Sequence, residues 1–252
     1  MRRATMVFVV LAASFTWLLA MTAPASAAVV SAQADAYVEN MYGNTDTNFG
    51  GEAVLLAKYE SAFDADRKAY IRFDVSSLTT PADDYILGLN VVNSGRGAVN
   101  PTQVYEFVVY GLEHGVGEGW LQSGITWNNA PANASKNLFT GGATSLGTFS
   151  ITGTGAGSTI SFSNPAMAAF IESDTDDEVT FMIARNTSGG GGSYNYIHAF
   201  ASMESTIGGP TLEAVYSGAM HHAPEPGTVI IWSVLGVLGI GGGWWRRRRR
   251  AA

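Results

Sequence analysis

Hydrophobic and polar residues alternate along many short stretches of this chain, and long stretches with the 3.6-residue period of a helix are missing. Between Lys68 and Val75 the odd-numbered residues are apolar, and the even-numbered ones are lysine, tyrosine, arginine and aspartate. This alternation predicts a strand with one buried and one exposed side. Eight further stretches have the same character, at residues 35–39, 53–58, 85–92, 103–110, 159–163, 179–185, 194–200 and 211–216. Nine strands separated by turn-rich segments predict an all-β sandwich.

One short helix is predicted after residue 163. Asn164 is a suitable N-cap, Pro165 suits the first helical position, and apolar residues follow in pairs four positions apart. Gly-rich segments at 141–142, 153–157 and 189–192 are predicted to be loops. None of them has the strand–loop–helix setting or the lysine of a phosphate-binding loop.

The two ends of the chain differ from the part between them. Arg2 and Arg3 precede an apolar stretch at residues 6–21, and the small-residue triplet 25–27 has the form that signal peptidase cleaves. This pattern predicts a signal peptide over residues 1–27. Residues 226–245 carry no formal charge, and they can cross a bilayer as a single transmembrane helix over 227–245. The basic tail at 246–252 is then expected on the cytoplasmic side.

Charge and cysteine content exclude several kinds of binding site in the part between these ends. Residues 28–223 contain 20 of the 21 acidic residues, all except Glu225, but only seven of the 14 basic residues. The net charge of this part is therefore about −13. Such a charge argues against binding nucleic acid or anionic lipid. The chain has no cysteine, which excludes disulfides and thiolate metal sites.

Five stretches of this middle part occur together in a familiar order. They read ADAYV at 34–38, DTNFG at 46–50, RKAYIRFDVSSL at 67–78, ITWNNAP at 125–131 and GPTLEAVY at 209–216. In this order they resemble the DNRLRE domain, a group similar to carbohydrate-binding module family 96. The resemblance implies a jelly-roll β-sandwich over residues 28–218 that binds extracellular polysaccharide. Met203 stands where a basic residue is common in such domains, which together with the negative charge argues against polyanionic glycans.

Sugar binding needs an accessible aromatic ring with hydrogen-bonding groups around it. Tyr194, Tyr196 and His198 alternate onto one face of their predicted strand and are the first candidates, with core packing of the same side chains as the alternative. The polar face of the strand at 68–75 supplies further ligand-binding candidates, Lys68, Tyr70 and Arg72. Trp127 is expected to fill the core, and the place of Trp120 stays open.

Catalytic residues are scarce in this sequence. A polysaccharide lyase needs a tyrosine or histidine base beside a cation, and Tyr70 with Arg72 or Lys68 is the one combination of this kind that the strand pattern offers. His114 is expected to be a polar loop residue, and His221 and His222 to be linker residues. The domain is therefore predicted not to be an enzyme.

No cofactor is required by this interpretation, but a structural Ca²⁺ is an option. Calcium sites in secreted sandwiches are built from carboxylates and carbonyls of different strands. Asp35 and Glu213 lie in two of the stretches that carry the family resemblance, and Glu204 ends the stretch at 200–204, which looks like the family's penultimate strand. These three residues are the predicted ligands.

The C-terminal segment resembles the PEP-CTERM sorting signal of Gram-negative bacteria. The resemblance rests on Pro224, Glu225 and Pro226 at the end of a linker over 219–226, on the apolar span, and on Arg246, Arg247, Arg248, Arg249 and Arg250. It implies recognition by an exosortase and transfer from a membrane-tethered precursor to the cell surface or extracellular matrix. The predicted function is non-catalytic polysaccharide binding in that location. A structural matrix protein that binds no sugar is the alternative, and a polysaccharide lyase is the third hypothesis.

Overall fold

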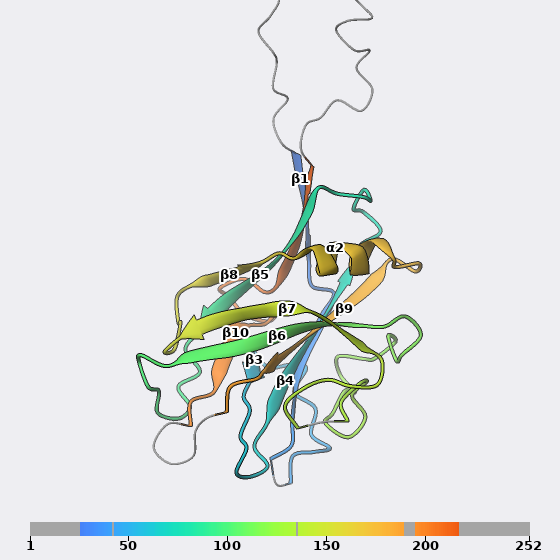
Figure 1. Ribbon diagram of the computed structural model, residues 1–252. Coiled ribbons are helices and arrows are strands. Elements are labelled where there is room, and N and C mark those ends of the chain that lie inside the picture. Colours follow the sequence, from blue (N-terminus) through green and yellow to red (C-terminus); the bar gives the residue numbers. More distant parts are fainter. Residues whose placement is uncertain (1–25, 42, 135, 189–194, 217–252) are drawn as a thin grey trace, which may run out of the picture. The chain divides into compact units, whose positions relative to one another are not determined.

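Eleven strands of the computed structural model form two antiparallel sheets (Figure 1). The structure describes residues 26–41, 43–134, 136–188 and 195–216. In the first sheet the strand order is β1 (Ser26–Ser31), β11 (Thr211–Tyr216), β5 (Asp84–Val92), β10 (His198–Ala201) and β3 (Val54–Ala57), and β8 (Thr159–Phe162) also pairs with β5. In the second sheet the order is β2 (Ala34–Glu39), β4 (Arg67–Asp74), β9 (Glu178–Arg185), β6 (Val104–Leu112) and β7 (Ala143–Thr152).

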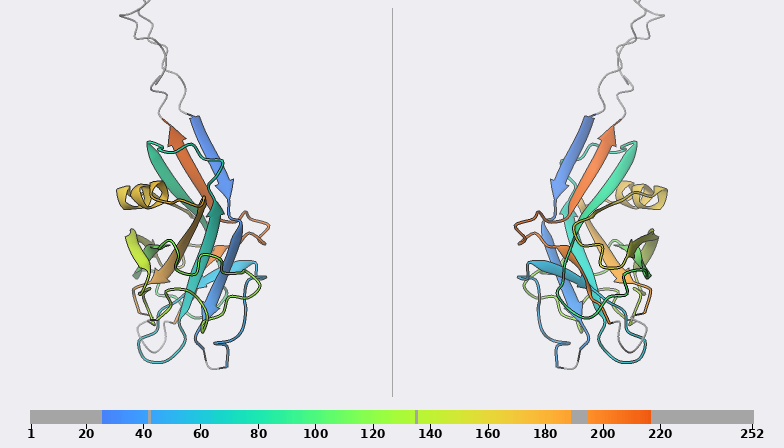
Figure 2. Two further views of the ribbon diagram at one scale, coloured as in Figure 1. Left: turned by 90° about the vertical axis from the view of Figure 1, so that its right-hand side faces the viewer. Right: turned by 90° about the vertical axis from the view of Figure 1, so that its left-hand side faces the viewer.

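The main apolar core lies between the two sheets. In β5 the odd-numbered residues from Tyr85 to Val91 are buried, and in β4 Ala69, Ile71 and Phe73 face the same core. All described strands and all apolar clusters lie within Ser26–Tyr216, which forms one compact unit with its own core. Ser26 pairs with Tyr216, so this unit begins and ends at the same place (Figure 2). The prediction of an all-β sandwich is confirmed.

A second apolar cluster covers the opposite face of the second sheet. The segment 113–142, which we call the cover segment, places Trp120, Ile125 and Phe139 against Tyr70 and Met182 of the sheet. The prediction that one side of β4 is exposed is therefore wrong for its first half. The alternation was read correctly, but a long irregular segment lies over the polar face and satisfies its polar atoms.

Strands β1 and β7 were not predicted. In β7 only Leu146 and Ile151 are buried, and these two residues are five positions apart, which does not fit a simple two-residue period. The pairing of β7 with β6 shifts between Val109 and Tyr110, and this irregularity lets both apolar side chains face the core. β10 begins at His198, later than the predicted start at residue 194.

The predicted helix is present as α2 (Pro165–Glu172). The Asn164 side chain accepts a hydrogen bond from the main-chain N–H of Ala166, and Met167 and Ile171 are buried against the core. The helix packs beside β5 and β7 (Figure 1). Among the residues that the structure describes, no helix is long and apolar enough to cross a membrane. The predicted signal peptide, transmembrane helix, sorting motif and basic tail lie outside them, apart from Ser26 and Ala27.

Candidate functional site

The predicted aromatic face at residues 194–200 is buried. His198 is fully enclosed, with its Nε2 3.0 Å from the main-chain oxygen of Gly153 and its Nδ1 3.2 Å from Nη1 of Arg185. Burial, together with the Arg185 charge, lowers the pKa of His198 to about 4, so the ring is neutral. Tyr196 is also buried and donates a hydrogen bond to Asn93. For these two residues the structure shows the alternative, core packing, and not an exposed sugar platform. Tyr194 lies outside the described residues.

Lys68 and Tyr70 are buried beneath the cover segment. Lys68 Nζ donates hydrogen bonds to Oδ1 of Asn133 at 2.8 Å and to the main-chain oxygen of Leu138 at 2.9 Å. The Tyr70 hydroxyl donates to the main-chain oxygen of Pro131 at 2.9 Å. Since burial raises the pKa of Tyr70 well above its usual value, this phenol is a poor general base. The expectation that they lie on an accessible face is wrong, because their polar ends hold the cover segment instead.

Arg72 has a similar role at the edge of this layer and remains partly accessible. Its Nη1 donates to the main-chain oxygens of Glu118 and Trp120, at 3.0 Å and 3.1 Å, and its guanidinium lies over the Trp120 ring. A 3.8 Å ion pair joins the same group to Glu178. Arg72 thus fixes the turn that presents residues 118–120.

Directly after this turn the cover segment forms a hollow of about 250 Å³. Its lining comes from Trp120, Leu121, Gly124, Ile125 and Asn129. The indole of Trp120 is buried and donates from Nε1 to Oγ1 of Thr180 at 3.1 Å, whereas Leu121 is 66% exposed. The hollow combines apolar carbon with an exposed amide, which suits the apolar face and hydroxyl groups of a sugar ring.

The loop of Asn129 is held in place by its own side chain. The Asn129 amide accepts from the main-chain N–H of Thr126 and donates to the main-chain oxygen of Gly124. The rim of the hollow is therefore a defined structure and its shape depends on short local hydrogen bonds. No periodic pattern marks this irregular segment, so the sequence does not place Trp120 and does not single out Leu121 or Asn129.

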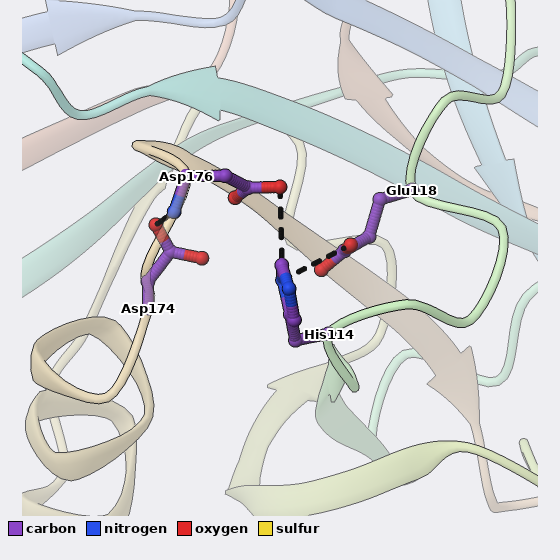
Figure 3. Close-up of side chains that lie close together, drawn as sticks. All are labelled: His114, Glu118, Asp174 and Asp176. Atoms are coloured by element: carbon purple, nitrogen blue, oxygen red, sulfur yellow. Dashed lines mark hydrogen bonds and ion pairs between the residues drawn. The ribbon is translucent and has the colours of Figure 1, made fainter.

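Four side chains of types that can bind a metal ion meet at a second position (Figure 3). His114 and Glu118 come from the cover segment, and Asp174 and Asp176 from the loop between α2 and β9, with ligand atoms that all lie within 4.8 Å of one another. His114 Nδ1 lies 3.3 Å from Glu118 Oε2 and 3.6 Å from Asp176 Oδ2. Burial and the Asp176 charge raise the pKa of Asp174. An imidazole with three carboxylates is a donor set that can hold a divalent transition-metal ion.

This cluster was not predicted from the sequence. His114 is exposed, as expected of a polar loop residue, and its spacing to Glu118 was visible. The acidic loop at 174–178 lies far away along the chain, and its position is set by the packing of α2 and by the pairing of β9 with β4.

Of the three predicted calcium ligands, the structure brings two together. The Asp35 carboxylate in β2 lies beside that of Glu204, which follows β10. Glu213 lies in β11 of the first sheet, where it pairs with Val29 of β1 and Ile86 of β5, whereas Asp35 lies in β2 of the second sheet. The role of Glu213 as a calcium ligand stays a prediction.

Comparison with known families adds an independent result. The model of carbohydrate-binding module family 96 matches residues 26–214, which is nearly the whole of the described sandwich. The search of curated proteins found no match.

Proposed function

The chain belongs to carbohydrate-binding module family 96, and on this premise we propose that its sandwich binds an extracellular polysaccharide and catalyses no reaction. The family match is the observation that carries this proposal. The burial of Tyr70 and Lys68 supports the non-catalytic part, because the base and the cation that a lyase requires are both engaged in holding the cover segment.

We place the binding site at the hollow of the cover segment. The support is its chemistry and its rigidity: Leu121 is exposed at the rim, Trp120 and Ile125 form apolar lining, and Asn129 offers an amide. Arg72 ties the base of this segment to β4 through two main-chain oxygens. A site that is already formed loses little conformational entropy on binding.

The negative charge of the domain indicates which class of glycan it binds. Between residues 28 and 223 the net charge is about −13, and the cover segment that forms the hollow also carries Glu113 and Glu118. Like charges repel across an interface, and this favours neutral over polyanionic polysaccharides. The basic residues of this region, Lys68 and Arg72, are committed to internal contacts.

The binding test compares two aliphatic side chains of equal exposure. Leu121 is 66% exposed at the hollow, and Ile207 is 65% exposed in the turn before β11. For a glycan found in a panel of neutral and acidic polysaccharides, Leu121→Ala is expected to weaken binding about tenfold, which is the effect of losing roughly 1.4 kcal/mol of apolar contact. Ile207→Ala is expected to bind like the wild type. Isothermal titration calorimetry on fragment 26–216 measures both.

Two outcomes would contradict this proposal at different levels. If Phe63→Ala, which removes an exposed ring in the loop after β3, abolishes binding while Leu121→Ala does not, then the assigned location is wrong. If no glycan of the panel binds, the function itself is wrong. Altered matrix cohesion on deletion of the gene would then favour the structural matrix role.

We also propose that the protein is exported and sorted to the cell surface or extracellular matrix. The support is the N-terminal signal-peptide pattern, the Pro224-Glu225-Pro226 triplet, the apolar span and the terminal arginines. Signal peptidase and an exosortase are the expected partners. Mass spectrometry of the mature protein from the cell surface is expected to find it without residues 1–27 and without Arg246–Arg250. An intact arginine tail on most molecules would indicate a permanent anchor instead.

A further inference from the structure

One buried carboxylate oxygen has no hydrogen-bond partner. Asp35 in β2 is 1% exposed, and its Oδ2 accepts from the main-chain N–H of Met203 at 2.8 Å, whereas its Oδ1 is buried and unpaired. Among the described residues it is the one carboxylate oxygen in this condition. Leaving an acceptor of this kind without a partner costs free energy that a native fold normally avoids.

A second carboxylate adds negative charge at this position. The exposed Glu204 carboxylate lies beside that of Asp35, near enough for a hydrogen bond between the two side chains when one of them is protonated. Within the described parts of the chain, neither carboxylate forms an ion pair with a lysine, arginine or histidine. A shared proton or a bound cation would offset the repulsion between two adjacent carboxylates.

The surroundings of the pair hold these oxygens in place. Gln122 Nε2 donates to Glu204 Oε1 at 2.6 Å and to the main-chain oxygen of Gly50 at 2.6 Å, and Gln122 Oε1 accepts from the main-chain N–H of Asp35 at 3.1 Å. A side chain at Gly50 would overlap the main-chain oxygen of Gln122, so this approach is possible only for glycine. Four separate segments therefore converge here: β2, the loop before β3, the cover segment and the turn after β10.

From this geometry we propose that a Ca²⁺ ion is bound between the carboxylates of Asp35 and Glu204. The donors at this position are carboxylate oxygens, which calcium prefers, whereas sites for zinc or copper use imidazole or thiolate. The ion supplies the missing partner of Asp35 Oδ1 and neutralises the charge of Glu204. It joins the first strand of the second sheet to the turn between β10 and β11, and through Gln122 it braces the segment that forms the hollow.

Thermal unfolding of fragment 26–216 tests this site without reference to sugar binding. The protein is stripped with a chelator and then melted with no added metal, with Mg²⁺ and with Ca²⁺. At a hundredfold excess of Ca²⁺ over its Kd the midpoint is expected to rise by about 5–10 °C. Asp35→Asn and Glu204→Gln are expected to lose this rise, and the control Glu213→Gln to keep it.

Three results would overturn the proposal. The first is a wild-type midpoint that Ca²⁺ does not change, together with no heat of Ca²⁺ binding in calorimetry. The second is a rise that persists in both Asp35→Asn and Glu204→Gln. The third is a rise that disappears in His114→Ala but not in Asp35→Asn, which would place the ion in the cluster of His114, Glu118, Asp174 and Asp176. Loss of glycan binding in any of these variants has no bearing on the ion.

Discussion

Replacing Arg185 by alanine is expected to lower the free energy of unfolding by about 4 kcal/mol, because buried acceptors lose their donor and a cavity remains. Arg185 is fully buried in β9. Its Nη1 donates to the main-chain oxygen of Tyr196 at 2.6 Å and contacts His198 Nδ1, and its Nη2 donates to the main-chain oxygen of Tyr59 at 3.1 Å. Its guanidinium also lies 5.0 Å from the centre of the Tyr105 ring. One side chain thus links β9, the segment before β10 and the loop after β3.

Urea unfolding of fragment 26–216 measures this effect. Arg185→Lys keeps the charge, but a lysine has one nitrogen and cannot reach the main-chain oxygens of both Tyr196 and Tyr59. We therefore expect a loss of stability between that of the wild type and that of Arg185→Ala. Arg96→Ala removes an exposed arginine and serves as the control, with no measurable change expected. A loss below 1 kcal/mol for Arg185→Ala would show that this buried cation contributes little net stability, as is known for some buried charges.

Replacing Trp120 by alanine is expected to affect both stability and binding. The ring is 7% exposed, contacts Tyr70 edge-on at 6.0 Å between ring centres, and lies beneath the Arg72 guanidinium. Its indole N–H donates to Thr180 of β9. Truncating a buried tryptophan costs about 3–5 kcal/mol. Because the same ring lines the hollow, glycan affinity is expected to fall below detection.

The two effects of Trp120→Ala can be separated. Far-ultraviolet circular dichroism at low temperature establishes that the variant is folded before binding is measured. Trp120→Phe keeps much of the ring contact and loses the hydrogen bond to Thr180, and it is expected to retain measurable binding with a smaller loss of stability. Phe63→Ala removes a ring that is already exposed and is expected to alter neither property. Unchanged affinity in folded Trp120→Ala would contradict the location of the site.

The sandwich could be predicted because most of its strands follow simple physical patterns. β5 alternates buried and half-buried residues along its length, as expected of a strand with one face on the core. β7 could not be found in this way, since the irregular pairing with β6 changes the side to which its residues point. Lys68 and Tyr70 on the polar side of β4 were both predicted to be accessible, and both are buried. The two errors have one cause, because the sequence pattern does not show that a distant segment covers that face.

The candidate sites could be predicted only in part. Asp35 and Glu204 were grouped as calcium ligands because both lie in segments that resemble known domains, and the structure places their carboxylates side by side. Their binding of an ion stays a prediction. The hollow depends on an irregular segment whose position is set by contacts with Tyr70 and Arg72, and such long-range contacts leave no periodic signal. His198 was chosen as a polar residue on an aromatic face, but it is buried beside Arg185 and the ring of Tyr105, and alternation does not reveal either partner.

The most direct test of the proposed function is to locate a bound oligosaccharide on the domain. Fragment 26–216 labelled with ¹⁵N is titrated with an oligosaccharide of the polysaccharide that binds best, and the amide chemical shifts are followed by nuclear magnetic resonance. The largest shifts are expected within residues 118–129 and at the Trp120 indole N–H, with little change in the loop that carries Phe63. Shifts concentrated in that loop, or on the exposed side of β1 and β11, would contradict the assignment of the binding site to the hollow.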